Sequence, residues 1–233
     1  QSIANKTISD LLSNSGNGLL VSSPKAVTIF RFQFSFMREY QEMQTPNKAS
    51  RVRFVLCDPS LPANIGAAAR AIKTMGFRDL WVVNPKHPDY REHPDAIALS
   101  TSSVDVLRES HSVATLTEAL NGVTFAWALS GYDREYGPPI EELRSAASRA
   151  CDFLASEPGD IAFVFGTERS GLTNAEIEVC QGIAAIPADP ESPSLNLAQS
   201  VQVTAYELHM TERSRAGEEG KLYDWETRFD RDP

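Results

Sequence analysis

The 233-residue chain carries a formal net charge of −9 at pH 7, and 42% of its residues are hydrophobic. This composition supports a sizeable core, and no run is long and apolar enough to span a bilayer. The acidic balance argues against a nonspecific nucleic-acid binder, although it leaves room for a local basic patch. Cys57, Cys151, Cys180 and the histidines lack metal-site spacing, so we expect reduced thiols, no metal and a cytoplasmic location.

Composition divides the chain into three parts. Residues 1–42 are rich in Ser, Asn and Gln and lack a signal-peptide pattern, so we interpret them as a disordered or non-native extension. The natural protein would then start at Met43. Residues 43–213 resemble one folded domain, and residues 214–233 form a charged, mobile tail.

From residue 51 onward, short apolar runs alternate with amphipathic segments. We expect strands at residues 51–57, 80–83 and 123–129 and in the runs that begin at Ile161 and Ile183. We expect helices at residues 64–75, 95–101, 116–120, 140–154, 174–180 and 195–213. This order predicts an α/β fold, a mostly parallel sheet with helices on both faces. No GxGxxG follows the first strand, which disfavours a dinucleotide-binding domain.

Two polar turns follow buried strands in the second half of the chain. GTERSGL (residues 166–172) comes after the run IAFVF, and SPSLNLAQSVQVTAYEL (residues 192–208) comes after IAAI. Ligands in open α/β sheets bind outside the carboxyl ends of the strands. The sequence therefore predicts a site for one small molecule between these two loops.

Three segments, each at a predicted strand-to-helix junction, carry a family resemblance. They are NIGAAARAIKTMGF (residues 64–77), VFGTERSGL (164–172) and IPADPESPSLNLAQSVQVTAYEL (186–208). In this order they resemble the motifs of SpoU/TrmH-class RNA 2′-O-ribose methyltransferases of the SPOUT superfamily, most of all its TrmJ branch. The resemblance runs from about residue 51 to about residue 210, which is nearly all of the chain after Met43.

The resemblance implies a specific fold and activity. The fold would be an α/β knot in which the carboxyl-terminal segment threads through a loop as a trefoil, a rare exception among protein topologies. S-adenosylmethionine would bind in the knot and leave as S-adenosylhomocysteine. The enzyme would be a homodimer with sites at the subunit interface, and it would methylate nucleotide 32 of the tRNA anticodon loop.

The resemblance also assigns catalytic roles to Arg70, Ser194, Asn64 and Glu168. Arg70 would act on the ribose 2′-hydroxyl, directly or through a phosphate. A guanidinium stays protonated, so orienting the hydroxyl and gripping the phosphate is physically easier than removing a proton. Glu168 would hold the neighbouring loops by hydrogen bonds or orient Arg70 by charge. Structural alternatives remain open: a surface arginine that caps a helix, an Asn64 N-cap, a solvated turn carboxylate at Glu168, and a Ser194 cap of the last helix.

The implied cofactor-binding residues lie in three stretches of the sequence. They are Leu129, Ser130, Gly131, Gly166, Ile186, Pro193, Ser194, Leu195 and Asn196. Gly166 would let the loop backbone approach the ligand, and Gly66 would permit close backbone approach in the first motif. Ile186 would offer the adenine an apolar wall, and Asn196 would tie the loops together by hydrogen bonds.

RNA binding is expected from Arg70 and Arg134, within a basic surface. The other members of that surface are Arg51, Arg53, Lys73 and Arg78. The sequence departs from the family at residues 129–131, which read Leu-Ser-Gly where the TrmJ branch often has Thr-Ser-Ala. It departs again at residues 100–103, which read Ser-Thr-Ser-Ser where relatives usually carry Ala and Gly.

Three functions therefore compete. The leading one is a tRNA 2′-O-methyltransferase. The second is a noncatalytic RNA-binding or assembly protein that has kept the knot, which the acidic charge favours. The third is a methyltransferase of the same fold that acts on rRNA or on another tRNA position.

Overall fold

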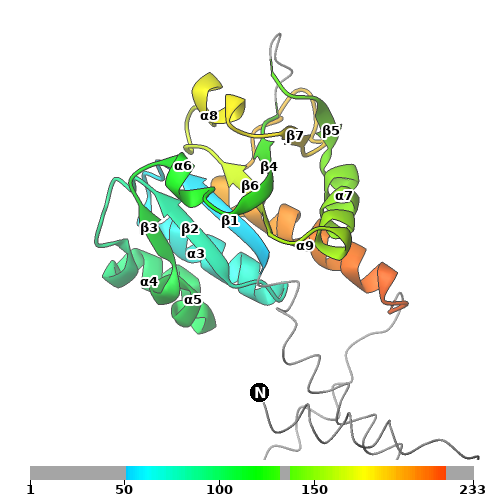
Figure 1. The fold of residues 1–233 in the computed structure, drawn as a ribbon. Coiled ribbons are helices and arrows are strands. Elements are labelled where there is room, and N and C mark those ends of the chain that lie inside the picture. Colours follow the sequence, from blue (N-terminus) through cyan, green and yellow to red (C-terminus); the bar gives the residue numbers. More distant parts are fainter. Residues whose placement is uncertain (1–50, 132–136, 219–233) are drawn as a thin grey trace, which may run out of the picture. The chain divides into compact units, whose positions relative to one another are not determined.

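The computed structural model describes residues 51–131 and 137–218, which form a seven-stranded sheet in the order β3-β2-β1-β6-β4-β7-β5. The strands are β1 (Val52–Cys57), β2 (Asp79–Val83), β3 (His111–Val113), β4 (Val123–Leu129), β5 (Ile140–Glu142), β6 (Asp160–Phe165) and β7 (Gly182–Ala185). Every neighbouring pair is parallel, which confirms the predicted sheet. The carboxyl ends of β6, β4 and β7 therefore lie next to one another at one edge (Figure 1).

Helices cover both faces of the sheet, as the alternating pattern predicts. The α-helices are α3 (Pro62–Thr74), α4 (Pro94–Ser100), α5 (Val104–Glu109), α6 (Leu116–Ala119), α7 (Leu143–Ser156), α8 (Asn174–Glu178) and α9 (Leu197–Arg215). Two short 3₁₀ turns, η2 (Tyr90–Glu92) and η3 (Thr101–Ser103), flank α4. One face packs against α3, α4, α5, α7 and α9, whereas the other carries only the short helices α6 and α8.

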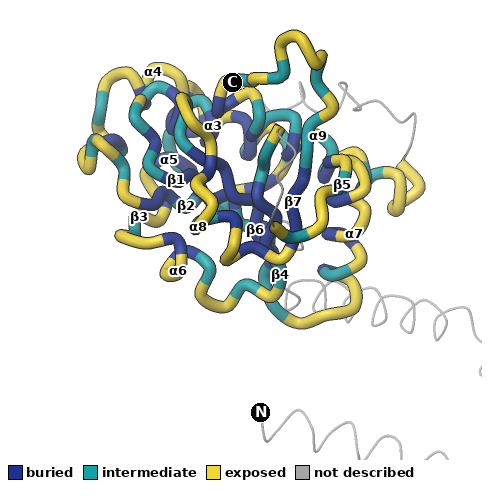
Figure 2. The backbone as a smooth tube through the Cα atoms, turned by 90° about the horizontal axis from the view of Figure 1, so that it is seen from above, coloured by how far each residue is buried: buried dark blue, intermediate teal, exposed yellow. Residues whose placement is uncertain are grey.

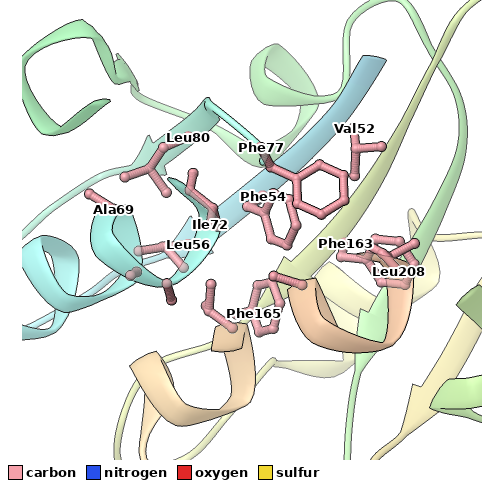
Figure 3. Close-up of a cluster of buried hydrophobic side chains, with 14 of the residues drawn as sticks. Val52, Phe54, Leu56, Ala69, Ile72, Phe77, Leu80, Phe163, Phe165 and Leu208 are labelled. Atoms are coloured by element: carbon pink, nitrogen blue, oxygen red, sulfur yellow. The ribbon is translucent and has the colours of Figure 1, made fainter. Parts of the chain in front are cut away.

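The larger core lies between the sheet and the α3–α9 layer. Strands β1 and β6 are mostly apolar because nearly every side chain on both of their faces is buried; the polar exceptions are Arg53 in β1 and Asp160 at the start of β6. Phe54 stacks on Phe165 with ring centroids 6.5 Å apart and lies 5.4 Å from Phe77 (Figure 3). Leu208 of α9 joins this cluster, so the last helix is packed into the domain (Figure 3). The strands form the buried centre, and exposed segments surround it (Figure 2).

Several element boundaries differ from the prediction. Helix α3 begins at Pro62 rather than at Asn64, and α9 begins at Leu197 rather than at residue 195. Ile140 was placed on a helix, which is wrong, because it pairs with Ile183 in the edge strand β5 and α7 starts only at Leu143. The edge strand β3 and the helix α5 have no counterpart in the prediction.

Some predictions fall on residues that the structure does not describe. The proposed extension at residues 1–42, Arg134 and residues 219–233 of the tail lie outside the described residues. The division into an extension, a domain and a tail therefore stays a prediction, as does the threading of the trefoil knot.

Candidate active site

A cavity of about 180 Å³ opens at the carboxyl ends of β4, β6 and β7. Since a water molecule takes up about 30 Å³ of liquid, this space suits a small organic ligand. Residues 129–131 after β4, residues 165–172 at the end of β6, and Ile186 with residues 193–195 after β7 form its wall, together with Leu197 and Ser200 of α9. This confirms the expectation that loops after neighbouring parallel strands enclose one ligand-sized space.

Nearly all of the predicted cofactor residues line this cavity. They are Leu129, Ser130, Gly131, Gly166, Ile186, Pro193, Ser194 and Leu195. The exception is Asn196, which does not line the cavity but caps α9. The two polar turns thus meet at one place with residues 129–131, the Leu-Ser-Gly stretch in which the sequence differs from the family.

The β6–α8 turn closes tightly on itself. The amide of Thr167 donates to the Gly171 carbonyl over 3.2 Å, and the Gly171 amide donates back over 3.0 Å. A Cβ added to Gly166 would lie 2.0 Å from the carbonyl carbon of Gly171, so only glycine fits. Gly166 lines the cavity, so close approach of its backbone to a ligand stays a prediction; its missing Cβ also makes room for the turn's own backbone.

The Glu168 carboxylate holds this turn against the start of α3. It accepts hydrogen bonds from the Ser60 amide at 2.9 Å, the Ser60 hydroxyl at 2.8 Å and the Leu61 amide at 3.1 Å. It also accepts one from Asn64 Nδ2 at 3.0 Å. No side chain makes an N-cap hydrogen bond to α3, but the Glu168 carboxylate lies at its amino end, where a negative charge interacts favourably with the helix dipole. The prediction that Glu168 holds neighbouring loops is confirmed.

Asn64 continues this polar chain to α9. Its Oδ1 accepts a hydrogen bond from Asn196 Nδ2 at 3.0 Å, across 132 positions of sequence. Asn196 Oδ1 in turn accepts the amide of Ala198 at 2.9 Å and forms a capping box with Gln199. The three sequence motifs are therefore joined by direct hydrogen bonds, and Asn196 ties the loops together as expected.

Two of the structural alternatives are wrong. Asn64 does not cap α3, because Leu61 occupies the N-cap and Asn64 lies in the first turn, 7% exposed. Ser194 does not cap α9, because Asn196 does. Ser194 is exposed and lines the cavity, so its hydroxyl is available to a ligand.

The pKa of Glu168 lies below its ordinary value of 4.5. Burial alone would raise it, but the hydrogen bonds from Asn64 and Ser60 outweigh that effect. The group is therefore a carboxylate at neutral pH, and its oxygens are occupied by partners in the first motif. This geometry suits a positioning role.

The family model described as the SpoU rRNA Methylase family matches residues 51–206, which is more than half of the chain. The chain belongs to the SpoU methylase family. The matched stretch contains every described residue that lines the cavity, the first two motifs and all but the last two residues of the third. The resemblance seen in the sequence is therefore confirmed.

Named relatives of this SpoU family member include TrmJ proteins. It is 40% identical over 177 residues to the tRNA (cytidine/uridine/adenosine-2′-O-)-methyltransferase TrmJ of Pseudomonas aeruginosa (strain UCBPP-PA14), covering 76% of this chain and 67% of the relative. It is 44% identical over 160 residues to the tRNA (cytidine/uridine-2′-O-)-methyltransferase TrmJ of Escherichia coli O6:K15:H31 (strain 536), covering 68% and 63%. The chain thus spans about two thirds of the length of these curated relatives.

A solved structure shares the fold. The crystal structure of a probable methyltransferase from Bordetella pertussis Tohama I superimposes with a TM-score of 0.66 and 48% identity. The match covers 70% of this chain and 97% of that chain. The arrangement described above is therefore that of a SpoU-family domain.

Arg70 is exposed on α3 and does not line the cavity. No hydrogen bond or ion pair joins it to another residue in the described ranges, so the idea that Glu168 orients it within one chain is wrong. The Glu168 oxygens instead face Ser60, Leu61 and Asn64. The guanidinium of Arg70 is thus free to meet a group from outside the chain.

Most of the predicted basic surface is occupied by internal partners. Arg51 donates to the carbonyls of Leu154 and Gly159, each at 2.9 Å, and Arg53 pairs with Asp160 at 2.6 Å. Arg51 thus ties the start of β1 to the end of α7 and the following loop, and Arg53 is paired with the start of β6, so internal partners occupy both guanidinium groups.

Lys73 and Arg78 share one carboxylate on α5. Each lies 2.7 Å from an oxygen of Asp105, and hydrogen bonds from both hold the pKa of Asp105 well below its usual range. Their charge is therefore largely balanced by the protein itself, and they do not form the free basic patch that the sequence suggested.

Sequence reasoning missed Ser60 and Arg169. Ser60 gives Glu168 both its amide and its hydroxyl, and the segment before α3 carries no pattern that points to this. Arg169 lines the cavity, and its position within the second motif, GTERSGL, could have identified it as a candidate site residue.

Cysteine and metal chemistry find no support in the described ranges. Burial raises the pKa of the Cys180 thiol to about 12, with Glu176 adding to the effect, and Cys57, Cys151 and Cys180 are buried and form no disulfide. No group of three or more His, Cys, Asp or Glu side chains in the described part could hold a metal ion. Within the same residues, no helix has the length and apolarity needed to cross a membrane.

Proposed function

We propose that this protein transfers a methyl group from S-adenosylmethionine to a ribose 2′-hydroxyl of tRNA, at nucleotide 32 of the anticodon loop. The observation that carries the proposal is the cavity at the ends of β4, β6 and β7, whose wall the second and third motifs supply. The TrmJ names of relatives at 40% and 44% identity support tRNA and the 2′-oxygen as the acceptor.

The cavity residues fit this cofactor. Apolar side chains of Leu172, Ile186 and Leu195 lie beside the backbone of residues 129–131 and hydroxyls such as Ser194. A flat apolar base needs the first kind of surface, and the ribose and amino-acid ends of the cofactor need the second. When bound, the cofactor supplies an activated methyl group on a sulfonium.

The chain's own contribution is placement. The cavity wall would hold the methyl donor, and Ser194 at its mouth would hydrogen-bond the acceptor hydroxyl. Arg70 would grip the adjoining phosphate and orient the 2′-oxygen, because a guanidinium gives up no proton at neutral pH. Glu168 and Asn64 would act one step away by fixing the turn against α3 and α9.

A homodimer completes this arrangement. Arg70 lies outside the cavity of its own chain, while Leu61, Tyr206 and Met210 leave 53%, 48% and 38% of their surface exposed at the start of α3 and on α9. Helices α3 and α9 pack against each other. A second copy docked on these helices would cover the apolar residues and bring its Arg70 toward the site. The proposed location is the cytoplasm, where tRNA is found and where buried thiols stay reduced.

One observation favours a second candidate substrate. The matching family is described by rRNA methylation, and an rRNA acceptor would use the same cavity. The noncatalytic alternative is less favoured, since the second and third motifs line the cavity and hydrogen bonds join the first motif to both. The acidic net charge of −9 is the feature that favours a noncatalytic assembly role.

The test is transfer of labelled methyl from S-adenosylmethionine to total tRNA and to rRNA, followed by nucleotide-level mapping of 2′-O-methyl groups. We expect label at tRNA nucleotide 32. Arg70→Ala should lower transfer by roughly a hundredfold or more, a typical loss for one catalytic group, with unchanged cofactor affinity in calorimetry. Arg108→Ala is the matched control, an exposed arginine paired with Glu92 at 3.0 Å.

Three results would contradict parts of this proposal. Label in rRNA alone would replace the substrate. Absence of cofactor binding would leave the noncatalytic RNA-binding function. Full transfer by Arg70→Ala would remove Arg70 from the mechanism while leaving the methyltransferase activity in place.

A further inference from the structure

The turn after β6 holds its tip rigidly over the cavity. The Thr167 and Ser170 hydroxyls lie 2.9 Å apart, and the Ser170 amide donates to Thr167 Oγ1 at 3.2 Å. With the paired amides of Thr167 and Gly171, these bonds close a small loop whose outermost residues are Glu168, Arg169 and Ser170. The backbone of Arg169 therefore has few conformations available.

Glu168 fixes the same tip from the other side. Its carboxylate is held by Ser60, Leu61 and Asn64, so the residue directly before Arg169 is anchored to α3. Its oxygens already accept hydrogen bonds and are not directed at the neighbouring guanidinium. The Arg169 side chain thus extends from a backbone that is held in place, and its guanidinium has no ion-pair partner among the described residues.

Arg169 is one of two arginines without an internal partner in residues 51–131 and 137–218. It makes no hydrogen bond or ion pair with a described residue, and the other such arginine is Arg70. The remaining described arginines all donate to acceptors in the protein, namely Arg51, Arg53, Arg78, Arg91, Arg108, Arg144, Arg149, Arg213 and Arg215. Among the described residues that line the cavity, Arg169 alone carries a positive charge.

We propose that Arg169 binds a backbone phosphate of the acceptor RNA at the mouth of the cavity. This inference rests on the proposed function and adds a substrate-binding residue to it. The planar guanidinium matches a phosphate with two parallel donors, and a rigid turn lowers the entropy cost of ordering it.

The position of Arg169 favours RNA phosphate over the carboxylate of the cofactor. Phe165, Gly166 and Leu172 are buried and form the inner wall, whereas Arg169 and Ser170 are exposed. A small ligand seated on the inner wall contacts the strand ends first. An RNA strand that places a ribose in this cavity must cross the exposed rim, where Arg169 lies.

The experiment compares full-length wild type, Arg169→Gln, Arg169→Lys and the control Arg108→Gln. Binding of bulk bacterial tRNA is measured by filter retention over a series of KCl concentrations, and S-adenosylmethionine affinity by calorimetry. We expect Arg169→Gln to weaken tRNA binding about tenfold, the scale of one charged hydrogen-bonded contact. The slope of log K against log salt should fall by about 1, as for one lost phosphate contact. Cofactor affinity should stay within twofold.

Arg169→Lys should keep the salt slope but lose part of the affinity, because a lysine supplies charge without the paired donors. In methyl transfer, Arg169→Gln should raise KM for tRNA more than it lowers kcat. Arg108→Gln should match wild type throughout. If Arg169→Gln instead weakens S-adenosylmethionine binding and leaves the salt slope unchanged, the guanidinium faces the cofactor and the inference is overturned.

Failure of this inference differs from failure of the proposed function. If wild type methylates tRNA and Arg169→Gln has the same salt slope and KM, Arg169 has no role in RNA binding, and the function stands. If wild type binds tRNA but transfers no methyl group, the proposed function fails. The salt slopes would still decide whether Arg169 contacts phosphate.

Discussion

Helix α3 meets two regions of the molecule that differ in how completely their polar groups are satisfied. At its amino end, Glu168 accepts hydrogen bonds from Ser60, Leu61 and Asn64, and Asn64 bonds onward to Asn196. Along its flank it packs against the segment from α4 to α5, where Ser103 is 1% exposed and its hydroxyl has no partner among the described residues.

The backbone repeats this contrast. In the β6–α8 turn the residue with positive φ is Gly171, at 66°, which glycine adopts without strain. In the α4–α5 segment it is Thr101, at φ 49° and ψ −116°, a conformation that a β-branched residue rarely adopts. Where the motifs meet, the residue types therefore suit the backbone conformation that they adopt. In the α4–α5 segment, where Ser and Thr replace the small residues expected from the family, the backbone conformation is strained for the residue that adopts it.

The largest expected effect comes from Gly166→Ala. The added Cβ would lie 2.0 Å from the Gly171 carbonyl carbon and 2.2 Å from the Leu172 amide nitrogen, so backbone must move. We expect the free energy of unfolding to fall by about 3 kcal/mol, the upper range for overpacking, and S-adenosylmethionine binding to be lost. Urea unfolding and calorimetry measure the two effects.

Gly171→Ala is the matched control in the same turn. A Cβ there meets nothing within 4 Å, so only the strain of positive φ remains. That strain costs about 1 kcal/mol. If both alanine variants lowered the free energy of unfolding equally, the turn could rearrange around an added Cβ. The motif junction would then be no more closely packed than the α4–α5 segment.

Glu168→Gln should give the next largest effect. The carboxamide carries no charge and cannot accept all the hydrogen bonds now made by the two carboxylate oxygens, so we expect a loss of about 2 kcal/mol near pH 7. The folded pKa lies below the ordinary 4.5, so the carboxylate stabilises the fold above that pH. The difference between wild type and Glu168→Gln should therefore shrink as the pH falls through the folded pKa and the group is protonated.

Urea titrations at several pH values provide the measurement, and Glu178→Gln is the control. Glu178 is an exposed carboxylate on α8 that makes no hydrogen bond or ion pair with a described residue, so a change below about 0.5 kcal/mol is expected. A Glu168→Gln loss that stayed constant down to pH 3 would show that the charge does not stabilise the junction.

How far sequence could predict the fold depends on the element. The buried strands β1 and β6 are largely apolar runs, interrupted in β1 by Arg53, and that pattern predicts both. The edge strand β5 was missed because Ile140 also fits the apolar stripe of the helix that follows. Its strand character comes from pairing with β7, more than 40 positions away. Short exposed edges such as β3 carry no periodicity that separates them from loops.

The site was predictable in position but not in its connections. The turns after β6 and β7 could be located because polar motifs follow apolar runs, and their residues do line the cavity. The bond between Asn64 and Asn196 joins positions 132 residues apart, which no local pattern encodes. Likewise, the sequence predicts that Arg53 is a surface cation, but its guanidinium pairs with Asp160 and donates hydrogen bonds to two backbone carbonyls.

The smallest expected effect tests the tolerant region through Thr101→Gly. Strain at this φ costs about 1–3 kcal/mol for a β-branched residue, while glycine adds up to about 1 kcal/mol of unfolded-state entropy, so we expect a net gain of about 1 kcal/mol. Ser102→Gly, whose φ is not positive, should instead lose about 0.5–1 kcal/mol by entropy alone. Thermal and urea unfolding measure both. Since Thr101 does not line the cavity, cofactor and tRNA binding should not change. If Thr101→Gly is as destabilising as Ser102→Gly, the positive φ carries no strain, and the α4–α5 segment is matched to its sequence as closely as the junction of the motifs.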